Sequence, residues 1–141
     1  GDYSPRHWGL GAFFEAKVAH GLGAFVQRRG EGRDGWWLLT AGGRVEGGIA
    51  IDGAAAATQG AHLRWFIVAE ELHGRGAGRA LLSEALAFCR QARHPRVFLW
   101  TFAGLHQARR LYEAHGFRLA EERSGSMWGT PVTEQRFECR L

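Results

Sequence analysis

Residues 61–82, AHLRWFIVAEELHGRGAGRALL, pass from an apolar strand pattern through a glycine-rich turn into a helix pattern. Glycine stands at every second position of residues 74–78, so the backbone can bend tightly and present its N–H groups where the helix begins. Free amides at a helix N-terminus, with the helix dipole behind them, suit a phosphate or pyrophosphate, and Arg75 and Arg79 add positive charge. The stretch therefore predicts an anion-binding turn between a strand and a helix.

The spacing of this turn excludes two common phosphate loops. A dinucleotide fingerprint needs Gly-x-Gly-x-x-Gly, but counting from Gly74 puts Arg79 in the third glycine place, and counting from Gly76 puts Leu81 there. The Gly-Lys-Ser/Thr of a Walker loop is absent. The remaining alternative is a flexible surface turn without a ligand, which would not require glycines at alternate positions beside two arginines.

Hydrophobic periodicity and turn residues along the chain predict alternating helices and strands. The first half is predicted to contain a helix over 10–26, two strands over 36–41 and 44–52 joined at Gly42-Gly43, and a third strand over 61–68. A helix that ends near Arg93, a strand over 97–102 and a helix closed by Gly116 follow. The last two predicted strands, over 117–122 and 135–141, are joined by the loop SGSMWGTPV. The strand, helix and strand in the middle imply a right-handed crossover between parallel strands. We therefore expect an α/β fold with a mixed, mostly antiparallel central sheet of six to seven strands and helices on both faces.

Composition restricts the chain to a few protein classes. A length of 141 residues fits one domain, and the net charge of +4 comes from arginines scattered along the chain, Lys17 being the only lysine. Scattered charge does not favour nucleic-acid binding by this chain alone. Cys89 and Cys139 lie far apart without a metal-ligand spacing, so we expect two buried thiols and no metal. No membrane span or signal peptide is visible, and a cytoplasmic location is the simplest expectation.

Two segments resemble the GCN5-related N-acetyltransferase (GNAT) superfamily. HGRGAGRALL, residues 73–82, resembles its acyl-coenzyme-A loop, Arg/Gln-x-x-Gly-x-Gly/Ala followed by a helix, with His73 as a departure at the Arg/Gln place. LWTFAGLHQARRLYEAHGFRLAEE, residues 99–122, is similar to the strand, helix and strand that carry the family's Leu-Tyr-Glu-x-x-Gly-Phe signature. Phe102 is a second departure, because relatives often have asparagine there.

A narrower resemblance concerns the two ends of the chain. FFEAKVAHGLGAFV near the start and the WG…EQRFE ending look like acetyltransferase domains fused behind MarR-type DNA-binding regulators. The chain shows no winged-helix segment, so we expect residues 1–141 to form a single GNAT domain, either a stand-alone relative or one excised from a longer regulator fusion. A homodimer is compatible with this resemblance.

The superfamily resemblance implies an N-acetyltransferase that moves acetyl from acetyl-coenzyme A to a primary amine of a small molecule or protein by direct attack. It implies that Tyr112 donates a proton to the departing sulfur. The residues implied to bind the coenzyme are Phe66, Ile67, Val68, His73, Gly74, Arg75, Gly76, Ala77, Gly78 and Arg79. A non-catalytic acyl-coenzyme-A sensor module is the alternative, since it shares the same binding site.

Two features of the acceptor side stay open at the sequence level. Five side chains near predicted strand ends or helix starts qualify as general base, and no spacing rule selects among Glu46, Asp52, His62, Glu70 and His106. We expect the substrate cleft where the parallel strands separate beside residues 66–68, and four tryptophans lie on strands near it. They either bind an aromatic or cationic amine by stacking or cation–π contact or fill the core. These tryptophans are Trp36, Trp37, Trp65 and Trp100.

Overall fold

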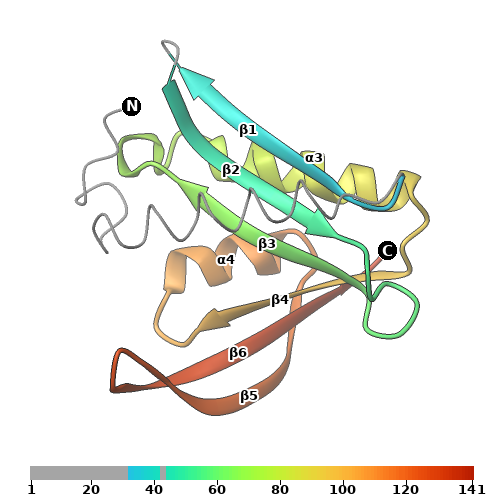
Figure 1. The fold of residues 1–141 in the computed structure, drawn as a ribbon. Coiled ribbons are helices and arrows are strands. Elements are labelled where there is room, and N and C mark those ends of the chain that lie inside the picture. The colour runs from blue at the N-terminus through green and yellow to red at the C-terminus, as the bar shows by residue number, and fades with distance from the viewer. Residues whose placement is uncertain (1–31, 42–43) are drawn as a thin grey trace.

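The computed structural model describes residues 32–41 and 44–141 (Figure 1). Its elements are β1 (Gly35–Ala41), β2 (Arg44–Asp52), β3 (Ala61–Val68), the 3-10 turn η1 (Glu70–Leu72), α3 (Ala77–Gln91), β4 (Arg96–Phe102), α4 (His106–Ala114), β5 (Arg118–Met127) and β6 (Thr130–Arg140). The helix predicted over 10–26 and the Gly42-Gly43 turn lie outside the described residues. Within them, no helix is long and apolar enough to cross a membrane.

The six strands form one sheet in the order β1-β2-β3-β4-β6-β5. β3 and β4 are parallel and every other neighbouring pair is antiparallel. The helix between the two parallel strands is α3, as the right-handed crossover rule requires. The predicted fold class, a mixed and mostly antiparallel sheet in an α/β domain, is confirmed.

The last two strands are longer than the sequence predicts. The segment predicted as the loop SGSMWGTPV continues the ladder between β5 and β6, with Ser124 opposite Thr133 and Met127 opposite Thr130. Trp128 and Gly129 then form a two-residue turn with φ of 51° and 80°, the left-handed values that such a tight hairpin needs. The ladder was missed because both faces of this hairpin are largely exposed, so no apolar alternation marks it in the sequence.

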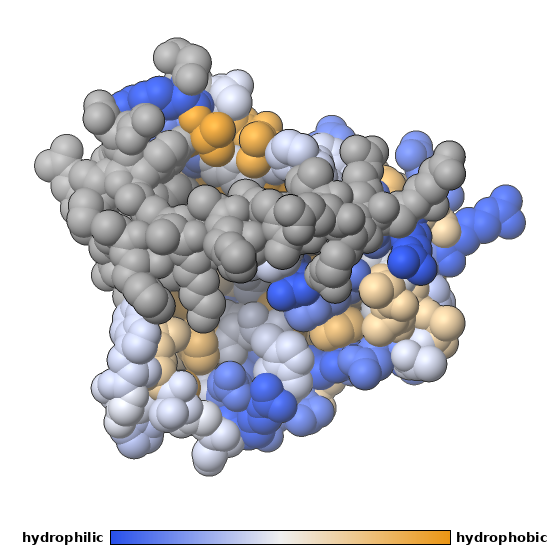
Figure 2. Space-filling view, in the orientation of Figure 1, coloured by the Kyte–Doolittle hydropathy of each residue, from blue (hydrophilic) through white to orange (hydrophobic). Residues whose placement is uncertain are grey.

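The core lies between one face of the sheet and the two described helices. α3 contributes a buried stripe at the predicted positions, Leu81, Leu82, Ala85, Leu86 and Cys89. α4 contributes one buried residue, Tyr112, whose ring packs near the fully buried Phe117 and Phe137. The two helices join the same cluster of buried side chains, so they cover the same face. On the face visible in Figure 2, hydrophilic and apolar side chains are interspersed outside the grey region.

Phe137→Ala should lower the free energy of unfolding by about 3–5 kcal/mol, because it empties a site with 0% exposure that the ring of Tyr112 also lines. The matched control is Val45→Ala at 38% exposure, for which we expect a change below about 1 kcal/mol. Urea unfolding of both variants measures the difference. Equal losses would contradict the placement of the core.

Candidate active site

A gap opens in the sheet where the two parallel strands separate. β3 and β4 are paired only at Ala61 with Val97 and at His62 with Phe98. Both strands continue beyond these pairs, to Val68 and Phe102. The sheet is therefore split at one end of this strand pair.

β3 carries a bulge beside this gap. Gly48 pairs with Ile67 and Ala50 with Arg64, so Trp65 and Phe66 together oppose one residue of β2. Trp65 has a φ of 50°, a left-handed conformation that bulky residues rarely adopt. Such a conformation costs on the order of 1–3 kcal/mol and persists where the surrounding structure fixes it, often at ligand sites.

The main chain at the end of β3 faces the gap. Ala69 N–H donates to the Glu46 carbonyl at 2.8 Å, and hydrogen-bonded pairs alternate along an antiparallel ladder. Val68, opposite Gly47, therefore directs its own N–H and C=O away from β2. Its carbonyl oxygen accepts a hydrogen bond from His73 Nε2 at 2.9 Å. The departure at His73 thus has a structural role, because it ties the glycine turn to the strand.

The glycine turn leads into α3 without a side-chain cap. Gly74 and Gly76 have φ of 77° and 82°, and a Cβ at either would meet nothing within 4 Å, so backbone conformation is the reason for both glycines. Gly78 has a different reason, because a Cβ there would lie 3.2 Å from Leu111 Cδ2 of α4. The helical hydrogen bonds begin with Ala80 N–H to Gly76 O, so the amides of the first turn point out of the helix end.

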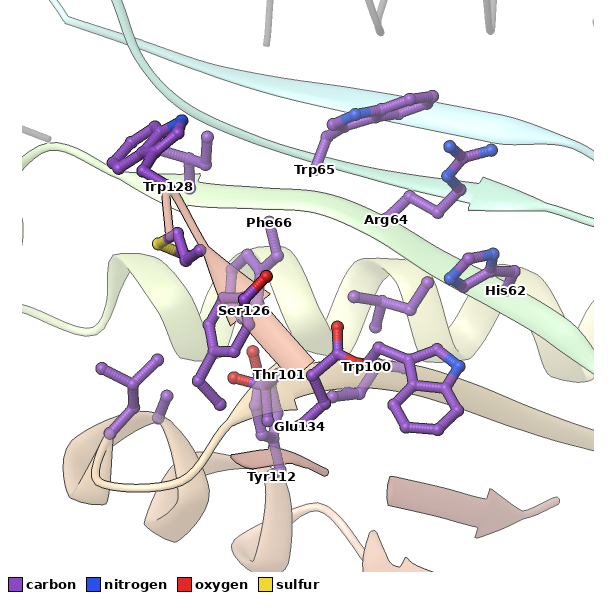
Figure 3. A pocket seen from close by; sticks show the side chains of 17 residues that line it. His62, Arg64, Trp65, Phe66, Trp100, Thr101, Tyr112, Ser126, Trp128 and Glu134 are labelled. Carbon is purple, nitrogen blue, oxygen red and sulfur yellow. The ribbon is translucent and has the colours of Figure 1, made fainter. Parts of the chain in front are cut away.

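Two adjoining clefts meet beside the turn. The first, which we call the loop cleft, has a volume of about 710 Å³ and is lined by the glycine turn, the end of β3 and α4. The second, the sheet cleft, has a volume of about 740 Å³ and lies in the gap between β3 and β4 and against the β5–β6 hairpin (Figure 3). Four residues line both clefts: Phe66, Leu105, Ala108 and Tyr112.

Most of the predicted coenzyme residues gather around the loop cleft. Seven of the ten predicted coenzyme residues line it, and so does Tyr112. The seven are Phe66, Val68, His73, Gly74, Gly76, Gly78 and Arg79. Ile67 lines the sheet cleft instead. Arg75 and Ala77 belong to the same turn but do not line the loop cleft.

Tyr112 lies at the junction with its polar end unpaired. It is 8% exposed, and burial raises its pKa to about 12. Its ring contacts are with Phe66, Phe117 and Phe137 at centroid distances of 6.2, 5.9 and 6.1 Å. Among residues 32–41 and 44–141, its hydroxyl has no hydrogen-bond partner. A buried phenol rarely lacks a partner unless a ligand or water supplies one.

The structure distinguishes the five candidate bases. His62 lines the sheet cleft and His106 lines the loop cleft. Glu46 is buried and pairs with Arg44 at 3.1 Å, Asp52 pairs with Arg64 at 3.3 Å, and Glu70 is exposed on η1. Of the five, only His62 lines the cleft that lies between β3 and β4.

His62 is an uncharged side chain at neutral pH. Its pKa is lowered from 6.5 to about 4, first by burial and then by Arg64, with Asp52 opposing and Arg136 adding to the effect. Its ring stacks on Phe98 at 4.5 Å. Neither ring nitrogen has a hydrogen-bond partner in the described part of the chain.

Several lining residues were not predicted. Ser126 and Trp128 belong to the segment that the sequence presents as a loop, and Glu134 on β6 enters with the same hairpin. The sequence feature that could have predicted this hairpin, and with it these lining residues, is the Trp128-Gly129 pair between two polar segments. Of the four tryptophans considered, Trp65 and Trp100 line the sheet cleft, whereas Trp37 packs on Phe88 in the core at 5.4 Å. Within the described ranges no group of His, Cys, Asp and Glu could hold a metal ion.

Comparisons with known proteins identify relatives of this architecture. The profile of the Acetyltransferase (GNAT) family matches residues 4–117. No curated protein sequence matches the chain significantly. The ribosomal-protein-alanine N-acetyltransferase from Brucella melitensis is a similar solved structure, with a TM-score of 0.74 at 18% identity over 86% of this chain and 78% of that one.

Two further solved structures are similar. The IAA acetyltransferase from Bacillus cereus has a TM-score of 0.66 at 19% identity, over 86% of this chain and 84% of that one. A GNAT family acetyltransferase from Elizabethkingia anophelis, solved with acetyl-CoA bound, has a TM-score of 0.67 at 14% identity, over 86% and 82%. At these identities the likeness shows the shared fold.

His62→Phe should reduce the loss of stability on acidification. The unfolded chain takes up a proton at His62 below pH 6.5, whereas the native state does so only near pH 4, so acidification through this window favours unfolding. Phenylalanine keeps a ring against Phe98 but cannot titrate. Urea unfolding between pH 6.5 and about 4 should show a shallower decline for the variant than for the parent protein. Parallel declines would contradict the lowered pKa.

Proposed function

The chain belongs to the GNAT family of acetyltransferases, and from that premise we propose that it transfers acetyl from acetyl-coenzyme A to a primary amine of a small molecule or protein by direct attack. The observation that carries the proposal is the hydroxyl of the buried Tyr112 at the junction of the two clefts, which has no hydrogen-bond partner among residues 32–41 and 44–141. One cleft fits the coenzyme and the other the acceptor, and the two reactants would meet beside this phenol.

The loop cleft offers the groups that coenzyme A needs. The outward amides at the start of α3, with Arg79 beside them, suit the pyrophosphate. The N–H and C=O of Val68 suit the amide groups of the pantetheine arm, which would run along β3 like an added strand. The bond from His73 leaves the carbonyl of Val68 one lone pair for such a contact.

The chemistry needs one bond to form and one to break. The amine nitrogen attacks the thioester carbonyl, the C–N bond forms, and the C–S bond breaks with its electron pair on sulfur. Tyr112 donates its proton to that sulfur, the attacking nitrogen loses one proton to water, and a proton from water restores the Tyr112 phenol. Its pKa of about 12 does not disqualify it, because the same apolar core raises the pKa of the Cys89 thiol to about 12. Burial would raise the pKa of a coenzyme thiol at the junction in the same direction, so acid and thiolate stay matched.

Tyr112→Phe should lower turnover about 100-fold or more, since it removes the proton donor while leaving the ring in place. Its unfolding free energy should stay the same or rise, because the hydroxyl has no protein partner to lose among the described residues. Thiol release from acetyl-coenzyme A measures turnover, and isothermal titration measures coenzyme affinity, which should not change. Unchanged turnover would overturn the acid role.

The same assay separates the enzyme from the sensor module. An acetyltransferase releases thiol from acetyl-coenzyme A when a suitable amine is added, whereas a sensor binds the coenzyme and releases no thiol with any amine of a broad panel. Tight coenzyme binding by the parent protein without amine-dependent release would therefore favour the sensor.

His73→Phe should weaken acetyl-coenzyme A binding about fivefold, because one hydrogen bond of about 1 kcal/mol no longer ties the turn to Val68. His73→Gln is the matched variant, since its side-chain amide can donate to the same carbonyl and should restore most of the affinity. Titration calorimetry on both variants measures the effect. An equal loss in the two variants would assign His73 to a different contact.

A further inference from the structure

The sheet cleft extends well beyond the junction at Tyr112, to a polar end formed by His62 and Arg64 on β3. From His62 to Phe66 the strand spans three positions of its partner β2, because the bulge sets Trp65 and Phe66 opposite one residue, and this corresponds to about 10 Å. Both ends line the same cleft. An acceptor whose amine lies beside Tyr112 therefore has room for a body and a second functional group that reaches the far end.

The far end offers hydrogen-bond donors that the protein does not use. Arg64 donates through Nη1 to Asp52 Oδ2 at 3.3 Å, and its other N–H groups have no hydrogen-bond partner in the described part of the chain. His62 likewise has no hydrogen-bond partner there, and a neutral imidazole has one N–H to donate. Figure 3 shows the two side chains together at one end of the cleft, with Trp65 and Trp100 along its length.

The charges around His62 make this end favourable for an anion. Burial is the first cause of the lowered pKa of His62, and beyond it Arg64 on β3 and Arg136 on β6 disfavour the charged imidazolium, with Asp52 on β2 offsetting them only in part. A positive field that disfavours the imidazolium favours a carboxylate in the same place. Arg136 lies over the ring of Phe98 at 4.0 Å, and His62 stacks on the same ring at 4.5 Å.

The rest of the cleft argues against a polycationic acceptor. Glu134 is the one carboxylate among its described lining residues, and Arg123 Nε binds it at 2.8 Å. The face of Trp100 is covered by the Arg123 guanidinium at 4.2 Å, and that of Trp65 by Arg64 at 4.1 Å. The faces of Trp65 and Trp100 that these arginines cover are not available to a second ammonium group, and the one carboxylate among the described lining residues is already paired.

We propose that His62 and Arg64 bind a carboxylate at the far end of the acceptor, so that the acceptor is an amine carrying an acid group across an apolar or aromatic body. This rests on the function proposed above. Arg64 would supply paired N–H donors in a fixed fork, His62 a single N–H, and the walls at Trp65 and Trp100 would contact the body. The two residues would determine specificity and take no part in the proton transfers at Tyr112.

The test compares three amines that differ at one end: p-(aminoethyl)benzoate, its methyl ester, and the diamine p-(aminoethyl)benzylamine. The parent protein should show kcat/KM for the carboxylate about 10-fold or more above the ester, because the carboxylate accepts charge-assisted hydrogen bonds. The diamine should be the poorest of the three. An ester or diamine that equals the carboxylate would overturn the inference, even though thiol release would still support an acetyltransferase.

Two variants locate the effect. His62→Phe keeps the ring on Phe98 but removes the N–H, and Arg64→Lys keeps a charge for Asp52 but removes the fork. Each should lower kcat/KM for the carboxylate about 10-fold, mainly through KM, and lower that for the ester much less, because the ester accepts only uncharged hydrogen bonds. Arg140→Lys, at an exposed position at the end of β6, is the control and should change neither substrate. Equal losses for both substrates would mean a structural role and would overturn the assignment.

A binding measurement keeps the two proposals separable. Quenching of tryptophan fluorescence reports occupancy, since Trp65 and Trp100 line the cleft. Tighter binding of the carboxylate than of the ester, lost in His62→Phe, supports the subsite even when no amine releases thiol, in which case only the proposed acetyl transfer fails. Equal binding of the two overturns the subsite whatever the turnover.

Discussion

The parallel pairing of β3 with β4 is short, and the arrangement of the site depends on its shortness. Two residue pairs join the antiparallel ladders on either side into one sheet. A longer pairing would close the gap and remove the sheet cleft that lies between the strands. A sheet with no pairing there would come apart into separate hairpins. The sheet is thus continuous at one end of these strands and open at the other.

Side chains reinforce the closed end. Arg96 at the start of β4 donates from Nη2 to the Thr58 carbonyl at 2.6 Å and from Nε to the Gln59 carbonyl at 3.2 Å. Arg136 of β6 adds a bond to the same Gln59 carbonyl at 3.3 Å. Gly60 permits this close approach, because a Cβ there would lie 2.7 Å from Arg96 Cγ. The connection before β3 is therefore hydrogen-bonded to β4 and β6, and these bonds add to the two residue pairs that hold β3 and β4 together at this end.

The sequence predicted those parts of the molecule that depend on local patterns. The glycine turn, the α3 stripe and the order of strands and helices along the described part of the chain follow from spacing and periodicity, and the structure has them. The length of the β5–β6 hairpin was underestimated because residues 124–134 around its turn are exposed or half-buried, so that part of the ladder rests on backbone pairing that hydropathy does not record. The choice of His62 among five polar candidates depends on where β3 and β4 separate, and no local pattern in either strand encodes that point.

The bulge at Trp65 changes the face of the sheet on which the side chains in the rest of β3 lie. Side chains alternate along a strand, so in a regular strand His62, Arg64 and Phe66 would share one face. The extra residue shifts the phase by one, which leaves His62 stacked on Phe98 and places Phe66 on the opposite face against Gly78 and Tyr112. One strand thereby presents His62 and Arg64 on one face of the sheet and Phe66 on the other, and all three line the sheet cleft. The length of this strand is as restrictive as its composition, because losing the extra residue of the bulge would return Phe66 to the face of His62 and Arg64.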